Sequence, residues 1–351
     1  MSAAQATIAS SVPSGTIDWL TESDNPAVAT LVRRHLLGEK DSPDLDALWA
    51  RRNQYAPVDR ILEAMRDDGS WLAPERDYKK YEGSLWQIHF LGELYANPDD
   101  ERVQRAVAYA FSRQLEDGSW SANGRPAGAS PCLTANVGRA LARMGHAADE
   151  RIVAAIGYCA ELYGTLGYLG CRDMRDFALN GYCHMVAPKI LLLLGEVPKK
   201  SWPTDAPALR DACVAALRDK QIFRCLPREF KEFQAQVWPA PAAERSEVRE
   251  RFLAEHSPLH YDDKPGWLRF GYPLSYNSDA LEALLALAAV GETRRPEYKP
   301  ALEVVRDAAD GEMRWKMRTS FNGKMLADVE VKGKPSKWLT WRALKVLDFF
   351  G

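Results

Sequence analysis

The sequence repeats itself with a period of 49 residues. The stretch RDDGSW at 66–71 returns as LEDGSW at 115–120. The longer segment 99–120 realigns on 148–169 with the same offset. A period of this length predicts a repeat architecture, in which each unit is one supersecondary element that buries its apolar face against the next unit.

Each repeat predicts a pair of helices. One member of each pair is strongly apolar, rich in Leu and Ala, and in several cases ends on a glycine suited to a helix C-cap. These buried inner helices are predicted at 84–96, 132–145, 184–195, 279–291 and 337–350. The partner helices, such as 100–114 and 150–164, carry charge on one side and apolar residues at helical spacing on the other, so we expect one face in solvent.

The repeated turn contains an acidic residue, a glycine and a tryptophan. We expect Gly69 and Gly118 to adopt positive φ in a tight turn, which glycine does without steric cost. Trp71 and Trp120 would then fill the gap before the next inner helix. We interpret this motif as a structural staple between repeats rather than as a ligand-stacking site.

Charge and terminal sequence exclude several classes of protein. The 46 basic and 48 acidic side chains leave a formal charge of −2, so no broad cationic face is expected for nucleic acid. The start of the chain lacks the pattern of a signal peptide, and the apolar run at 190–194 is too short to span a bilayer. Six cysteines are too sparse for a disulfide framework. We expect a cytoplasmic protein with a flexible tail over 1–15 and a single domain over 16–351.

The stretch QLEDGSW at 114–120 resembles the QW motif of squalene and oxidosqualene cyclases. Together with the helix-pair period, it resembles the wider prenyltransferase and terpenoid-cyclase superfamily across residues 60–350. The resemblance implies an α/α toroid of about five to six hairpins, with parallel inner helices around a largely apolar central cavity and antiparallel outer helices. Segments 25–38 and 43–65 would supply a first helix pair.

The resemblance is informative about fold and leaves the reaction open. The D-x-D-D acid motif of class II cyclases is absent from the sequence. The chain also has room for one toroid, whereas the cyclases have two helical domains. The superfamily therefore implies an apolar, isoprenoid-like or aromatic small-molecule substrate without naming the chemistry.

A candidate metal site lies at the starts of inner helices in consecutive repeats, where we expect the cavity to open. Its proposed ligands are Cys132, Cys171, Cys183 and His184. Thiolate and imidazole are usual ligands of a tetrahedral Zn²⁺, which would act as a Lewis acid. Adjacent helical residues point about 100° apart, so we expect only one of the last two to ligate. Buried structural thiols, or a catalytic thiol paired with His184, are the alternatives.

Further polar and aromatic residues lie at predicted inner-helix starts. Candidates for proton transfer or anion binding are Asp279, Tyr276, His184 and Lys337, and candidates for substrate binding are Glu82, Trp86, His89, Tyr272 and Asn277. The alternative, nonfunctional roles are an N-cap for Asp279, a solvated surface lysine for Lys337, and core packing for Trp86.

Residues 221–270 interrupt the repeat with charged and Pro-rich sequence, and we predict an insertion that covers the cavity as a lid. The leading hypothesis is a zinc-dependent lyase, hydrolase or transferase acting on an apolar small molecule. The alternatives are a metal-free cyclase or isomerase, and a noncatalytic ligand-binding or scaffold protein.

Overall fold

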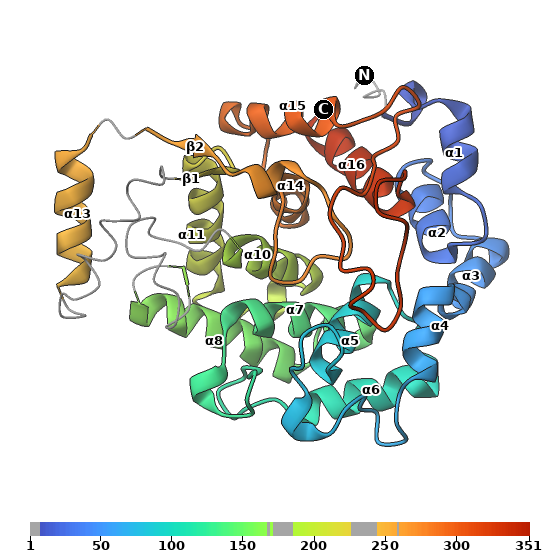
Figure 1. Cartoon of the computed structure of the whole chain (residues 1–351), viewed down its shortest axis with the longest axis horizontal. Helices are drawn as coiled ribbons and strands as arrows, with labels where there is room; N and C mark the ends of the chain where they lie inside the picture. Colours follow the sequence, from blue (N-terminus) through green and yellow to red (C-terminus); the bar gives the residue numbers. More distant parts are fainter. Residues whose placement is uncertain (1–7, 167–168, 171–184, 226–243, 258–259) are drawn as a thin grey trace.

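The computed structural model describes residues 8–166, 169–170, 185–225, 244–257 and 260–351. Most of this chain is α-helical (Figure 1), as the all-α prediction required. Within the described ranges the named strands are β1 (Arg224–Cys225) and β2 (Asp262–Asp263), which pair antiparallel.

Six helices form an inner layer in which each helix packs against the next. In order of contact they are α5 (Ser84–Glu93), α7 (Pro131–Leu141), α10 (Val186–Glu196), α14 (Ala280–Ala289), α16 (Lys337–Phe350) and α2 (Pro26–His35). Five of these fall on the predicted buried segments, and α2 falls on the predicted first pair. Figure 1 shows them succeeding one another around the middle of the molecule.

The remaining long helices lie outside this layer. They are α1 (Ser14–Leu20), α3 (Pro43–Ala50), α4 (Ala56–Glu63), α6 (Glu101–Ser112), α8 (Glu150–Leu166), α11 (Ala206–Asp219), α13 (Arg245–Glu255) and α15 (Lys299–Asp307). α6 packs on α5, α8 on α7, α11 on α10 and α15 on α14. Every residue of α5 and α7 is buried, whereas α6 buries residues spaced three or four apart, so the two predicted helix types are confirmed.

The repeated tryptophans are staples, as predicted. In three repeats the indole N–H donates to a carbonyl ten residues earlier, and the tryptophan backbone N–H donates to a hydroxyl of the next inner helix. The pairs are Trp71 with Ile61 and Ser84, Trp120 with Ala110 and Thr134, and Trp315 with Val305 and Thr340. Each indole therefore joins an outer helix to the following inner helix, and the indole N–H keeps a partner while the ring is buried.

The turn glycines satisfy two constraints at once. Gly69 and Gly118 have φ of +83° and +84°, which confirms the predicted left-handed conformation. A Cβ on Gly69 would also lie 2.3 Å from the Arg105 carbonyl oxygen, and one on Gly118 would lie 2.5 Å from that of Ala154. Glycine is thus needed for the turn and for the close approach of the next outer helix.

One predicted C-cap is wrong. Gly195 lies inside α10 rather than after it. A Cβ at this position would lie 2.6 Å from the Cβ of Ala289 on α14, so the glycine serves close packing of two inner helices.

Part of the segment predicted as a tail is ordered against the rest of the chain. Residues Ile8–Ser11 form a 3₁₀ helix, and the backbone N–H of Ile8 donates to Asp348 at 3.0 Å. The hydroxyl of Thr16 donates to the Glu312 carbonyl at 2.6 Å. The N-terminal segment thus contacts the C-terminal repeat.

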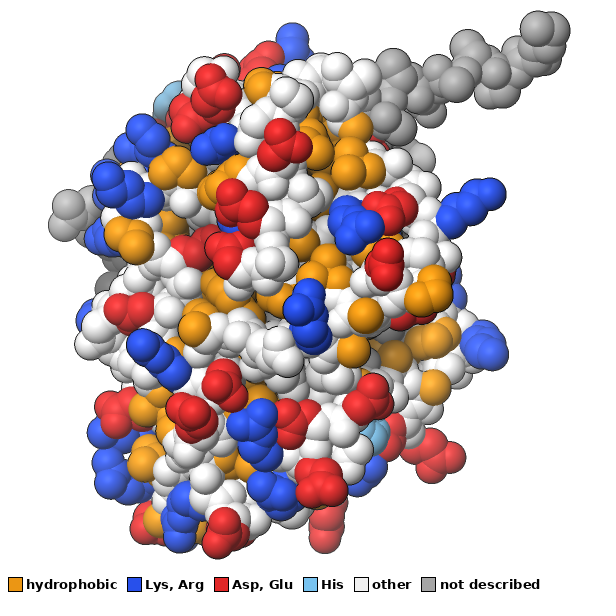
Figure 2. Space-filling model, turned by 90° about the vertical axis from the view of Figure 1, so that its right-hand side faces the viewer, with side chains coloured by type: hydrophobic (Ala, Val, Ile, Leu, Met, Phe, Trp, Pro, Cys, Tyr) orange, Lys and Arg blue, Asp and Glu red, His pale blue; other side chains and the backbone are white. Residues whose placement is uncertain are grey.

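The predicted insertion contains the β1–β2 pair and α13, which Figure 1 draws at the outer edge of the molecule. Residues 226–243 lie outside the described ranges, so the predicted lid stays a prediction. In Figure 2, acidic and basic side chains are interspersed over the face shown, in keeping with the near-neutral charge. Among the helices described, none has the length and hydropathy that crossing a bilayer requires.

Candidate functional site

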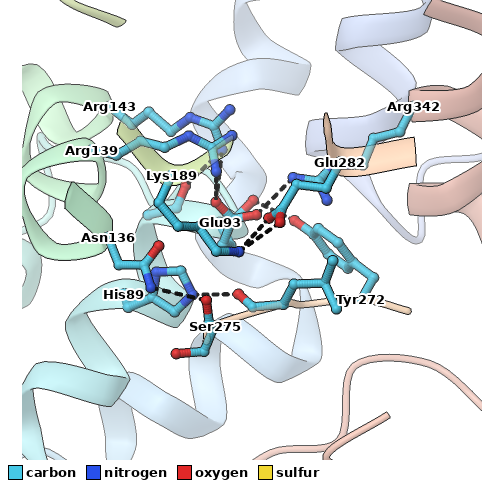
Figure 3. Close-up of polar contacts among 12 residues, drawn as sticks. His89, Glu93, Asn136, Arg139, Arg143, Lys189, Tyr272, Ser275, Glu282 and Arg342 are labelled. Carbon is cyan, nitrogen blue, oxygen red and sulfur yellow. Dashed lines mark hydrogen bonds and ion pairs between the residues drawn. The ribbon is translucent and has the colours of Figure 1, made fainter. Parts of the chain in front are cut away.

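The inner helices bring charged side chains into contact with one another, and Figure 3 shows their polar contacts. Each lies in an inner helix and is at least 95% buried. They are Glu93 of α5, Arg139 of α7, Lys189 of α10, Glu282 of α14 and Arg342 of α16. The family resemblance implied a largely apolar centre. The structure instead places ion pairs there, and these must satisfy one another because burial of a lone charge is costly.

Glu93 is the hub of this network. Its carboxylate forms ion pairs with Arg139 and, at 2.8 Å, with Arg342, and Arg143 approaches to 3.5 Å. Burial by itself raises the pKa of Glu93, but the three guanidinium groups outweigh it and hold that pKa well below its usual range. Glu93 is therefore a buried anion shared by Arg139 of α7, Arg143 just after α7 and Arg342 of α16.

Arg143 and Glu196 extend the network toward the C-terminal ends of the helices. Arg143 Nε donates to Glu196 at 2.6 Å, and its guanidinium carbon lies 4.2 Å from the centre of the Tyr95 ring. Arg139 Nε approaches the same carboxylate at 3.5 Å. Within the described chain, the Nη2 atom of Arg139 is buried without a hydrogen-bond partner, which leaves an unused donor on a cationic group.

Lys189 and Glu282 form a second buried pair. The ammonium group lies 2.7 and 2.6 Å from the two carboxylate oxygens, and it also donates to the Asn277 carbonyl at 3.1 Å. Because both side chains are nearly inaccessible to water, removal of either partner would leave an uncompensated charge.

The segment preceding α14 lies across the inner helices. His89 Nε2 donates to the Leu274 carbonyl at 2.6 Å, and the amide of Asn136 donates to the Ser275 carbonyl at 3.1 Å. The Tyr272 hydroxyl donates to the Glu93 carbonyl at 2.5 Å, and its ring lies 4.6 Å from the Arg342 guanidinium carbon. Burial lowers the pKa of His89, so its role here is that of a neutral donor that holds the backbone.

A cavity of about 390 Å³ adjoins this network. It lies among the later turns of α2, α7, α10 and α14 and along α16. Its charged lining is Arg139, Arg143, Glu196, Arg342 and Lys345, and its aromatic lining includes Tyr95, Trp338, Trp341 and Phe349. Four cationic groups thus face one carboxylate, beside rings that offer flat apolar surfaces. This combination suits an organic anion with an apolar body.

The cavity lies away from the predicted mouth. We expected functional groups at the starts of the inner helices, but the residues lining this cavity come largely from the ends of those helices. None of the predicted site residues that the structure describes contributes to its wall.

Two predicted catalytic residues have structural partners. Asp279 accepts from the backbone N–H of Glu282 at 2.8 Å and of Gly271 at 3.1 Å, so it caps α14. Burial, followed by the charge of Glu282, raises the pKa of Asp279 to about 7. Lys337 is buried, and its ammonium group contacts Glu22 at 2.8 Å and also Asp24. It ties the N-terminal segment to α16 and is not the solvated lysine that we considered.

Two predicted aromatic residues, Trp86 and Tyr276, form a cluster with Tyr78 near the N-terminal ends of the inner helices. The rings of Trp86 and Tyr276 are 5.3 Å apart, and Tyr78 lies 6.1 Å from Tyr276. Trp86 Nε1 is buried without a hydrogen-bond partner in the described chain. Asn277 is exposed, and Glu82 pairs with Lys79 at 2.5 Å.

The candidate metal ligands are only partly described. Cys132 is buried in the first turn of α7, while Cys171, Cys183 and His184 lie outside the described residues. In the ranges that the structure covers, no three His, Cys, Asp or Glu side chains gather closely enough to hold a metal ion.

Sequence reasoning missed the central ion network, although a signal was present. Several members are charges within a largely apolar run, as in VGRAL around Arg139, APKILL around Lys189 and LTWRAL around Arg342. Charges of this kind are rarely buried unless they are paired. Their spacing also indicates a shared helix face. Steps of three and four residues separate Asn136, Arg139 and Arg143, so these side chains lie on the same side of the helix.

No family model matches this chain, and no curated protein matches it.

Proposed function

We propose that this protein is an α/α toroid that holds a small organic anion in its central cavity, with the apolar part of the ligand against the aromatic wall. Support for the toroid comes from the unbroken packing order of the inner helices from α5 to α2. It also comes from Glu93 of α5, which reaches Arg342 of α16 across the centre.

The observation that carries the proposal is the cavity itself. Arg139, Arg143 and Arg342 already share two carboxylates, Glu93 and Glu196, and Lys345 adds a fourth positive charge at the wall. When Glu93, which pairs with the lining arginines, is counted together with the charged groups that line the cavity, the cations exceed the anions by two. An anionic ligand would relieve this imbalance in a partly desolvated site, where charge interactions are stronger than in water.

The volume of the cavity and its aromatic wall limit the ligand further. About 390 Å³ falls within the usual range of small-molecule sites. Trp338 is stacked on Tyr272 at 4.9 Å and lies parallel to Tyr95 at 6.1 Å, so the aromatic wall is held in place by its own ring contacts. Because this wall is flat and apolar and the other lining groups are cationic, the expected ligand is an aromatic or isoprenoid-like small molecule that carries a carboxylate or phosphate.

The binding test compares the affinity of the protein for 3-phenylpropionate with its affinity for the uncharged control 3-phenylpropanol. Calorimetry or tryptophan fluorescence measures the binding. We expect the carboxylate to bind at least about tenfold more tightly, which corresponds to about 1.4 kcal/mol. Ala288→Trp would fill the cavity without altering its charge, whereas Ala216→Trp places the same bulk on outer helix α11. Binding that survives Ala288→Trp, or absence of saturable binding to the wild type, would refute the proposal.

Metal-assisted chemistry by Cys132, Cys171, Cys183 and His184 is a second proposal, for a lyase, hydrolase or transferase. The observation that favours it is the place of Cys132, in the first turn of α7 and close enough to Tyr78 to contribute, after burial, to raising the pKa of that phenol. The aromatic cluster of Trp86 and Tyr276 would then face the substrate.

Elemental analysis of the purified full chain tests this second proposal. We expect close to one zinc per chain, with loss of zinc in Cys171→Ser and retention in Cys159→Ser, whose thiol is buried within outer helix α8. Substoichiometric metal in the wild type would leave the metal-free cyclase and the noncatalytic binding protein as the remaining candidates. The sparse cysteines of the sequence fit a reducing compartment such as the cytoplasm.

A further inference from the structure

Lys345 differs from the other cations that line the cavity. Arg139, Arg143 and Arg342 each contact the carboxylate of Glu93 or Glu196. In the described chain no hydrogen bond or ion pair joins Lys345 to a carboxylate, and its one close aromatic contact is the Trp341 ring, 5.7 Å from the ammonium nitrogen. The side-chain nitrogen is therefore available to a ligand.

The surroundings of Lys345 favour the neutral amine more than a surface site would. Partial enclosure by the cavity wall, followed by the positive charge of Arg143, lowers the pKa of Lys345. Arg139 and Arg342 act in the same direction, and Glu196 opposes them. A lysine beside other cations is a recurrent form of activated amine nucleophile. Its side chain keeps exposed surface at the cavity mouth, so a ligand can reach it.

The geometry of α16 places an anion-binding group and this amine together. Arg342 and Lys345 are three residues apart on one helix, and both line the cavity. Side chains at this spacing have Cβ atoms about 5–6 Å apart. A ligand that spans them needs a carbonyl carbon close to its carboxylate, and a 2-oxo acid has the two groups on adjacent carbons.

We propose that Lys345 forms an imine with a 2-oxo acid whose carboxylate is bound by the arginines of the central cavity, an inference that rests on the function proposed above. The Nζ lone pair attacks the carbonyl carbon, the carbonyl π electrons move to oxygen, and a proton transfers from nitrogen to that oxygen. The resulting carbinolamine loses water as the C=N bond forms. No oxidant or reductant is needed, and the products are the protein-bound imine and one water.

A plain anion-binding role for Lys345 is the competing explanation, and Lys345→Arg separates the two. Arginine keeps the positive charge but cannot form the imine. Under the proposal Lys345→Arg loses the covalent reaction with the 2-oxo acid. Under the competing explanation neither the wild type nor Lys345→Arg shows that reaction.

The experiment incubates the full chain with phenylpyruvate, reduces the mixture with sodium borohydride, and measures intact mass followed by peptide mapping. We expect one reduced adduct per chain, located on Lys345, and protection by excess 3-phenylpropionate. Lys345→Arg should lose the adduct, whereas Lys299→Arg, at an exposed lysine on α15, should keep it. Omission of borohydride should leave no stable adduct.

The outcomes distinguish this inference from the proposed function. Saturable binding of 3-phenylpropionate without a phenylpyruvate adduct on Lys345 overturns the imine and leaves the anion site standing. An adduct spread over several lysines, or one that persists in Lys345→Arg, also overturns the imine. Absence of binding by either acid overturns both proposals.

Discussion

The central prediction concerns Glu93→Gln, which removes the charge at the hub of the ion network while keeping the size of the side chain. Three buried guanidinium groups contact this carboxylate: Arg139, Arg342 at 2.8 Å and Arg143 at 3.5 Å. Arg143 and Arg139 keep Glu196 as a partner, at 2.6 and 3.5 Å, whereas Arg342 has no second carboxylate contact within the described chain. At least one cation is thus left unpaired.

Removal of one partner from a buried ion pair typically costs about 3–5 kcal/mol, and we expect Glu93→Gln to lose about this much in the free energy of unfolding. The loss is a large share of the roughly 5–15 kcal/mol available to a native protein. Urea denaturation at pH 7, followed by far-UV circular dichroism, measures it. The matched control is Glu303→Gln, an exposed carboxylate 3.7 Å from Lys299, for which we expect a change within about 0.5 kcal/mol.

A second variant tests the cause of the loss. In Glu93→Gln with Arg342→Met, the cation that lacks another partner is removed as well, so the double variant should recover part of the stability. A loss below about 1 kcal/mol in Glu93→Gln, or a double variant less stable than Glu93→Gln alone, would show that the network is not held by this charge.

Two further predictions concern the staple and the helix cap. Gly118→Ala should destabilise the protein by more than Gly291→Ala in urea denaturation. Both glycines have positive φ, which costs alanine about 1–2 kcal/mol, but only at Gly118 would the new Cβ also lie against a backbone carbonyl. Equal effects of the two substitutions would argue against the close approach of α8. Folding raises the pKa of Asp279 from 3.8 to about 7. The folded state therefore binds this proton more tightly than the unfolded state, and the free energy of unfolding falls between pH 4 and 7 by at most about 4 kcal/mol. Asp279→Asn should therefore gain stability relative to the wild type between pH 4 and 7, while the exposed control Asp205→Asn should track the wild type; parallel pH profiles for all three would contradict the raised pKa.

Much of the fold was predictable because the repeat is defined by residues that lie close together along the chain. The 49-residue offset, the apolar inner segments and the one-sided outer segments follow from helix periodicity and burial, and the structure confirms them. The turn glycines and tryptophans were also interpreted correctly, because positive φ and the burial of a large indole ring are local requirements. The close approach of Arg105 and Ala154 to those glycines was missed because it depends on a neighbouring repeat.

The candidate site was harder to predict. The sequence drew attention to residues at helix starts, and in Asp279 and Lys337 the structure shows a cap and an ion pair instead. A good capping residue and a good catalytic acid are the same residue type, so composition alone cannot separate them.

The sequence by itself determined the helical class, the order of buried and exposed helices, and the staple that joins the repeats, since these depend on contacts between residues close along the chain. Only the tertiary structure decided that Glu93 contacts Arg139 and Arg342, and that none of the carboxylates described pairs with Lys345 at the cavity wall. These contacts join residues up to 249 positions apart in the sequence. They depend on the rotation of each helix about its axis, where an error of one residue turns a side chain by about 100°.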